Sequence, residues 1–194
     1  MTDAATALEI VQRKLGRCLL HLQECESLLK SLVIHADIAG PPDQLQDIKD
    51  ARVKSLQKEM MGNLIGMLTK TVFTSAGIDA APPSPPNDQR ALVRIKYQIE
   101  LTAEQYDDLC CSFKELVSLR NELVHHFLER FDIRSQEGCT AADLHLDKCG
   151  KVIDVHYMKL FNFVKASDLA RAKLASAMET QEFKDAFIKG ILPD

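Results

Sequence analysis

A heptad pattern of apolar side chains runs through residues 3–37, and no other feature constrains the fold as strongly. Apolar residues recur there at alternating spacings of three and four. Such a seam is typical of one long helix packed against other helices. Further apolar positions widen the stripe, which favours burial among several helices over a two-stranded coiled coil. The seam consists of Leu8, Val11, Leu15, Cys18, Leu22, Cys25, Leu29, Leu32 and Ala36.

Similar stripes predict three more main helices and a short fifth one. The first helix must end at Gly40-Pro41-Pro42, because proline lacks an amide donor and restricts the residue before it. The other helices are expected at about residues 51–73, 102–131, 140–178 and 180–190. The sequence therefore predicts an all-α fold, a four- or five-helix bundle with long antiparallel helices, as one domain over residues 1–194.

Two local signals refine the helix boundaries and contacts. Thr102 and Gln105 fit a capping box at the start of the third helix, and Thr140 is in position to cap the fourth. In the second helix, Gly62 and Gly66 lie one turn apart. We expect these two glycines at a close helix–helix crossing.

The region between the second and third helices is the one part that does not look helical. Residues 75–90 contain four prolines in five positions and form a predicted proline-rich linker. Residues 91–101 then alternate strictly between apolar and polar side chains, which predicts one short β-strand before the third helix. Such a strand needs a partner. It pairs with the segment at 71–78, pairs with a second copy of the protein, or does not form.

Composition and charge exclude several classes of protein. The chain has 24 Lys+Arg against 28 Asp+Glu, a net charge of -4, so a generally basic nucleic-acid binder is not expected. No apolar run approaches a membrane span, and the N-terminus does not resemble a secretory signal. Six cysteines without a CxxC pair indicate reduced, buried thiols and a cytoplasmic location. Phosphate-binding glycine loops, dinucleotide fingerprints and HExxH motifs are missing, so no cofactor is expected.

Arg120 interrupts the apolar seam of the third helix. Leucine, valine and phenylalanine occupy the seam on both sides of it. Burying an unpaired guanidinium costs several kcal/mol. Arg120 is therefore either paired with an acidic residue of another helix or open to a groove or interface.

Polar residues suited to acid–base chemistry follow Arg120. Asn121 and His125 are four residues apart and share a helix face, and His126 follows directly. An ordinary helical ion pair is the simpler explanation for each histidine, with Glu129 one turn after His125 and Glu122 one turn before His126.

Taken together, the segment RNELVHH resembles the signature of the HEPN superfamily, the higher eukaryote and prokaryote nucleotide-binding domains. That signature is an Arg followed after four to six residues by a His, often with Asn directly after the Arg, on the third helix of a bundle. Arg120, Asn121 and His125 match it with a gap of four. In some toxin members a Tyr two positions after the His accepts adenylylation, and here that position is Phe127, which has no hydroxyl.

The resemblance implies a metal-independent endoribonuclease of a toxin–antitoxin or defence system. Two copies of the motif would meet at a homodimer cleft, with RNA as substrate and an antitoxin or regulatory protein as a further partner. Arg120 and His125 would be the catalytic residues, with Asn121 and His126 binding or orienting the substrate. The expected reaction is attack by the ribose 2′-hydroxyl, which leaves a 2′,3′-cyclic phosphate.

Two other functions compete with this interpretation. Zinc ligands occur at helical spacing in the first and fourth helices: Cys18, His21 and Cys25, and His145, Cys149 and His156. Cysteines in an apolar seam behave as small hydrophobes, however, and His156 fits a core histidine with a hydrogen-bond partner, so we expect no metal. The other alternative is a non-catalytic dimeric helical interaction or scaffold module.

Overall fold

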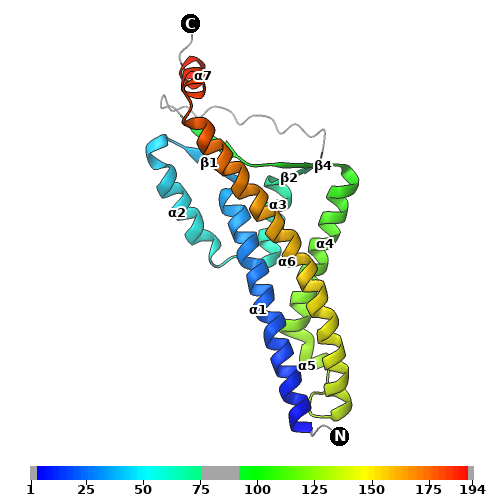
Figure 1. The fold of residues 1–194 in the computed structure, drawn as a ribbon. Coiled ribbons are helices and arrows are strands. Elements are labelled where there is room, and N and C mark those ends of the chain that lie inside the picture. Colours follow the sequence, from blue (N-terminus) through cyan, green and yellow to red (C-terminus); the bar gives the residue numbers. More distant parts are fainter. Residues whose placement is uncertain (1–3, 76–91, 192–194) are drawn as a thin grey trace.

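The chain folds as an all-α bundle with a small β element, as the sequence predicts (Figure 1). The computed structural model describes residues 4–75 and 92–191, so the predicted proline-rich linker lies almost wholly outside the described residues. Two long helices, α1 (Ala4–Ala36) and α6 (Gln136–Met178), lie side by side and form the long axis of the molecule. They contain 33 and 43 residues.

The second predicted helix is two helices, and the prediction of one helix over 51–73 is wrong. The helices are α2 (Leu45–Leu56) and α3 (Met61–Thr71). Between them the chain turns, and Met60 adopts an extended conformation with φ −85° and ψ 156°. Lys30 of α1 donates to the backbone carbonyl of Gln57 at this turn, over 3.1 Å. Met60 is exposed at this turn, and the next residue, Met61, is buried.

This extra reversal changes the relative direction of the two longest helices. Lys14 contacts Asp143 over 2.6 Å, and further along both helices His21 contacts Asp154 over 3.1 Å. Both helices therefore run in the same direction, and the predicted antiparallel arrangement is wrong for this pair. When four consecutive helices alternate in direction, the first and the last are antiparallel. When five alternate, the first and the last are parallel.

The third predicted helix begins as expected but is not uniform. It comprises α4 (Ala103–Asn121), a π-helical turn (Glu122–His126) and α5 (Phe127–Arg130). The capping box of Thr102 and Gln105 is confirmed. The segment from α4 to α5 runs antiparallel to α6.

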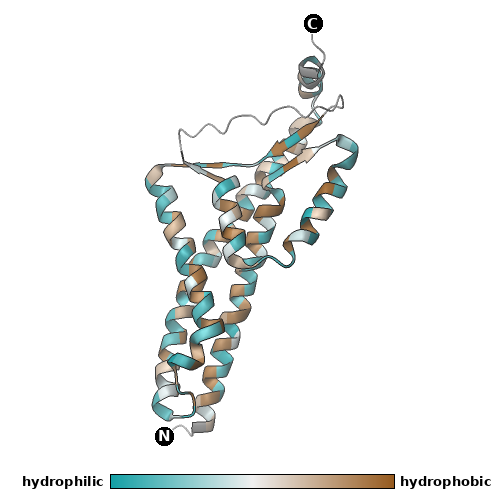
Figure 2. Ribbon diagram, turned by 180° about the vertical axis from the view of Figure 1, so that it is seen from behind, coloured by the Kyte–Doolittle hydropathy of each residue, from teal (hydrophilic) through white to brown (hydrophobic). Residues whose placement is uncertain are grey.

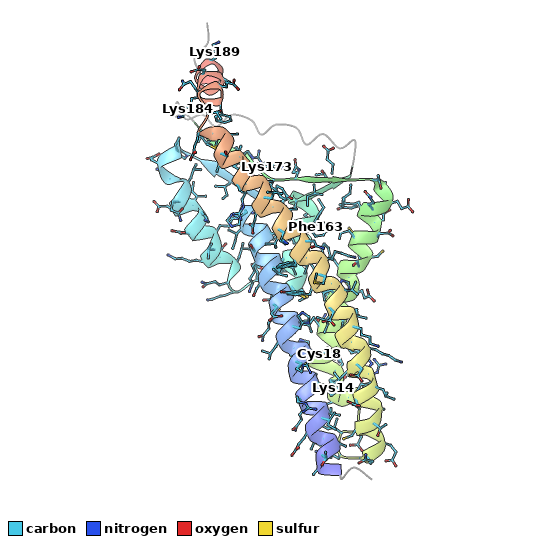
Figure 3. All side chains as sticks on the ribbon, viewed as in Figure 1. Lys14, Cys18, Phe163, Lys173, Lys184 and Lys189 are labelled. Carbon is cyan, nitrogen blue, oxygen red and sulfur yellow. The ribbon has the colours of Figure 1, made fainter. Side chains whose placement is uncertain are left out.

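Helix α6 starts earlier than predicted and extends past α1. Ser135, and not Thr140, caps it by accepting a hydrogen bond from the amide of Gly138 over 3.0 Å. A Cβ at Gly138 would lie 1.9 Å from the carbonyl oxygen of Asp132, so only glycine fits this turn. The short last helix, α7 (Gln181–Ile191), follows α6. Figure 3 shows Lys184 and Lys189 on α7, far from Lys14 and Cys18 at the α1–α6 contact.

The predicted strand forms and pairs in two places. It splits into β3 (Val93–Lys96) and β4 (Ile99–Leu101). Strand β4 pairs in parallel with β2 (Phe73–Ser75), within the segment proposed as its partner. Strand β3 pairs antiparallel with β1 (Asp37–Gly40), a pairing that no pattern in the sequence predicts. Pro42–Gln44 form a 3-10 turn between β1 and α2.

One hydrophobic core joins α1, α3, α4 and α6. Figure 2 shows the helices banded in hydrophilic and hydrophobic residues, as expected for helices buried on one side. The largest fully buried side chains are Phe73, Phe113, Leu29, Met61, Leu64, Leu68, Leu116, Leu146, Ile153, Leu160, Val11 and Val33. The core-facing side of α6 is buried or half-buried as far as Ser167, but Ala170, Leu174 and Ala177 beyond it are exposed.

The cysteines are free, and four of the six are buried as predicted. Cys110 is half-buried and Cys111 is exposed, because neighbouring residues of α4 cannot both face the core. None of the described helices combines the length and the apolar content that a membrane span requires.

Candidate functional site

Arg120 does not enter the core, although it continues the apolar seam. Its guanidinium is half-buried at the end of α4, and its Nη1 donates to Asn121 Oδ1 over 3.2 Å. The same nitrogen lies 3.0 Å from His125 Nε2. Within residues 4–75 and 92–191, no carboxylate lies within ion-pair distance of it. The alternative of a core arginine paired with an acidic residue is therefore wrong, and Arg120 is open to a groove.

The π-helical turn brings Arg120 and His125 together. On a regular α-helix, residues five apart point about 140° away from each other. A π turn closes hydrogen bonds between residues five apart and stacks them on one face. Glu122–His126 form that turn directly after Arg120. At its end, His126 leaves helical geometry with φ −121° and ψ 1°. Such turns are frequent at functional sites.

The opposite face of the same segment is anchored in the core. Leu123 and Phe127 are buried. Glu122 Oε1 lies 2.8 Å from His145 Nε2 of α6 and also contacts Arg130. These contacts hold the π turn against α6 and leave His125 on the outer side. Phe127, which has no hydroxyl, is a buried residue, and its ring packs against that of Phe131 with centroids 5.2 Å apart.

The ion pairs predicted for the two histidines do not form. His125 contacts Arg120 and not Glu129, and Glu122 contacts His145 and not His126. Glu129 pairs instead with His126, whose Nδ1 lies 2.9 Å from Glu129 Oε2. Both of these side chains are exposed. His126 therefore has an ordinary surface partner, while His125 is coupled to the arginine.

A groove of about 420 Å³ borders these residues. We call it the site groove. One wall comes from the first turn of α3 and the residue before it, which the sequence analysis did not connect with the site. The site groove is lined by Met60, Met61, Gly62, Asn63, Val117, Arg120, Asn121, His125 and His126. It thus brings all four predicted site residues together, and Asn63 adds a second amide.

The Arg120–His125 contact determines which nitrogen of the imidazole can accept a hydrogen bond from the guanidinium. Guanidinium nitrogens only donate hydrogen bonds, so in a hydrogen bond between these two atoms Nε2 of His125 is the acceptor. The lone pair of Nε2 then points at the guanidinium. An anion that draws Arg120 toward itself would release the lone pair of Nε2. The arrangement can therefore couple anion binding to the exposure of a base.

His156, which the sequence predicts to be a core histidine, lies in the core. Its side chain is 3% exposed, with Nδ1 3.3 Å from Ser112 Oγ and Nε2 3.2 Å from Glu115 Oε2. Burial lowers the pKa of His156, and Glu115 opposes that shift. It is not among the described residues that line the site groove.

The two sets of candidate zinc ligands do not assemble into a site. Among the described residues, no three His, Cys, Asp or Glu side chains are gathered to hold a metal ion. Burial raises the pKa of Cys25 to about 12 and that of Cys149 to about 11, which keeps both thiols protonated. His21 contacts Asp154 and stacks near Tyr157, with ring centroids 4.7 Å apart.

No family model matches the sequence, and searches of curated proteins and of solved structures find no match either.

Proposed function

We propose that the chain is a HEPN-like, metal-independent endoribonuclease with Arg120 and His125 as its catalytic residues. The observation that carries the proposal is the 3.0 Å contact between Arg120 Nη1 and His125 Nε2 beside an open groove. A charged fork of donors and a neutral imidazole are the groups that cleavage of a phosphodiester by its own 2′-hydroxyl requires.

The proposed reaction begins when the RNA phosphate takes the guanidinium away from His125. Nε2 of His125 then accepts the proton of the 2′-hydroxyl, and the 2′-oxygen attacks phosphorus. The bond from phosphorus to the 5′-oxygen breaks, which leaves a 2′,3′-cyclic phosphate and a 5′-hydroxyl end. Arg120 stabilises the charge that develops on the phosphate oxygens. Asn121, bonded to Arg120, orients the guanidinium, and His126 borders the substrate.

A homodimer would supply the second proton transfer. The departing 5′-oxygen needs a proton, and the His125 of a second copy across a two-fold axis would donate it from its protonated, imidazolium form and become neutral. Exposed apolar residues support such an interface. Met60, which lines the site groove, is 61% exposed, and Val124 and Leu128, close to His125 in the sequence, are 44% and 69% exposed. An antitoxin or other regulatory protein would bind to the same surface.

The test is cleavage of RNA in EDTA by the purified protein and by Arg120→Ala and His125→Ala. We expect wild type to produce 2′,3′-cyclic phosphate ends, and each variant to lose at least about a hundredfold in rate. Arg134→Ala and His21→Ala are matched controls, because they remove the same residue types outside the site groove. Sedimentation of every variant checks that folding and association are intact. Equal cleavage by all five proteins would exclude this site.

The second candidate function is a non-catalytic dimeric interaction module. It is supported by exposed apolar side chains on the outer face of α6, namely Leu144, Val155, Met158 and Leu169, each more than half exposed. In that case wild type cleaves no RNA, and Arg120→Ala weakens self-association without removing an activity.

A further inference from the structure

A second groove, of about 550 Å³, opens between α3 and α4. We call it the glycine groove, because Gly62 and Gly66 lie in its α3 wall. The prediction that these glycines mark a close helix crossing is wrong. A Cβ at Gly66 would meet nothing within 4 Å, and one at Gly62 would meet only Val117 Cγ1 at 3.9 Å. The missing side chains leave an open trough.

The contacts around the trough explain its shape. At the far end, the hydroxyl of Tyr106 donates to the backbone carbonyl of Thr69 over 3.0 Å and ties the two helices together. Ile65, Phe113 and Val117 give the trough an apolar lining. At the near end, the glycine groove and the site groove share Gly62, Val117 and Asn121. The two grooves are therefore continuous.

The polar groups around this trough favour an anionic ligand. Among the described residues that line the two grooves, Lys114 and Arg120 are the charged ones, two are histidines, and none is a carboxylate. This lining contrasts with the net charge of -4 over the chain. Ser118 and Asn121, one turn apart on α4, also line the glycine groove.

We propose that the glycine groove holds one unstacked base of a single-stranded RNA, next to the phosphate bound at Arg120. This inference rests on the proposed function and names its substrate class. The flat base packs on Ile65 and Val117, and Ser118 and Asn121 bond its polar edge. Lys114 takes the next phosphate. Val117 precedes Arg120 by three residues, about 4.5 Å along the helix, so the base lies one nucleotide from the cleaved bond. Recognition of splayed bases is how proteins usually read single-stranded RNA.

The decisive variant is Gly66→Leu, which fills the trough without a clash. The added side chain enters open space, and leucine is a better helix former than glycine, so the variant should fold at least as well as wild type. Gly16→Leu is the matched control. Gly16 is a glycine inside α1, where a Cβ also meets nothing within 4 Å, and it lies outside both grooves.

The probe is a fluorescent, fully 2′-O-methylated RNA of eight nucleotides, which cannot be cleaved, compared with the same strand carrying abasic sites. Loss of one stacked base typically weakens binding by about fivefold to a hundredfold. Wild type and Gly16→Leu should prefer the base-bearing strand by about tenfold in fluorescence anisotropy. Gly66→Leu should bind both strands equally.

Three results would overturn the inference. The first is equal binding of both strands by wild type, which includes no binding at all. The second is an unchanged preference for the base-bearing strand in Gly66→Leu. The third is a change in the sedimentation of Gly66→Leu that identifies the glycine groove as a contact between copies. Because the probe is uncleavable, the result does not depend on catalysis. A base preference without Arg120-dependent cleavage would refute the proposed function and leave the groove assignment standing. Cleavage without a base preference would do the opposite.

Discussion

Two histidine clusters lie along helix α4 and the turn after it. Their comparison distinguishes a histidine that supports the fold from one that is a candidate for catalysis. In one, His156 of α6 contacts Ser112 and Glu115, and Lys159 donates to Ser112 over 2.8 Å. In the other, His125 contacts Arg120, with Asn121 as the third member. Each cluster contains an imidazole, a cation and a neutral polar group, and the cluster of His156 also contains the carboxylate of Glu115. These shared residue types alone do not show which histidine is available for chemistry.

Access to a ligand distinguishes the two clusters. His156 is 3% exposed and lies among core residues, whereas His125 is exposed and lines the site groove. A buried imidazole with both nitrogens bonded holds helices together. An exposed imidazole whose one bond is to a mobile cation can exchange that partner for a substrate. The comparison teaches that a histidine with polar partners becomes a candidate base only where a groove reaches it.

The largest expected effect is on RNA cleavage. His125→Gln should abolish it, with a loss of about a hundredfold to ten-thousandfold in rate, because glutamine cannot accept the 2′-hydroxyl proton. His156→Gln should retain cleavage within a few-fold at 20 °C, since its side chain does not reach the site groove. Initial rates on one RNA in EDTA measure both. If the two variants exchange behaviour, the clusters have been assigned in the wrong order.

For the free energy of unfolding the order of the two positions should be reversed, with the larger loss at His156 and the smaller one at His125. His156→Ala removes a buried side chain and one of the two hydrogen-bond partners of Ser112, so it should lower the free energy of unfolding by about 2 kcal/mol. His125→Ala should change it by less than about 0.5 kcal/mol, as expected of an exposed position. Urea unfolding followed by circular dichroism gives both values. A large loss for His125→Ala would mean that the π turn depends on that imidazole.

Acid should act on the buried histidines. Burial lowers the pKa of His156 below its ordinary value and that of His35 to about 4. The unfolded chain then binds protons that the folded protein does not, so stability is present above about pH 6.5 and declines as the pH falls toward 4. His156→Gln and His35→Gln should each flatten that decline in urea titrations. An equally steep decline in both variants would assign it to other groups.

The smallest effect is expected at the rim of the buried cluster. Glu115 is 62% exposed although it contacts the buried His156. Solvent screens such a contact, so Glu115→Gln should lower the free energy of unfolding by less than about 1 kcal/mol at pH 7. Lys114→Gln is the matched exposed control on the same helix. A loss as large as that of His156→Ala would show that the contribution of His156 to stability comes from the Glu115 carboxylate and not from burial.

Much of the site was predictable because its signal is local. An arginine within an apolar seam marked the segment, and the resemblance of RNELVHH to the HEPN signature added Asn121 and His125 as candidates. The wall supplied by Met60–Asn63 was not predictable, since it depends on where α3 packs. Gly62 and Gly66 show the same limit: the sequence reveals that side chains are missing, and packing decides whether helices close on them or leave them open.

By itself, the sequence determined which segments are helical and which faces they bury, because a repeat of 3.6 residues is a property of the chain. It also determined the capping box at Thr102, and it offered the segment at 71–78 as one of three alternatives for the predicted strand, the one that β4 adopts. Tertiary structure alone decided the reversal at residues 57–60, the parallel course of α1 and α6, and the π turn at Glu122–His126. The reversal and the π turn interrupt the regular helical hydrogen-bond pattern and are held by contacts between distant residues, such as Lys30 with Gln57 and Glu122 with His145. The parallel course of the two long helices follows from that reversal.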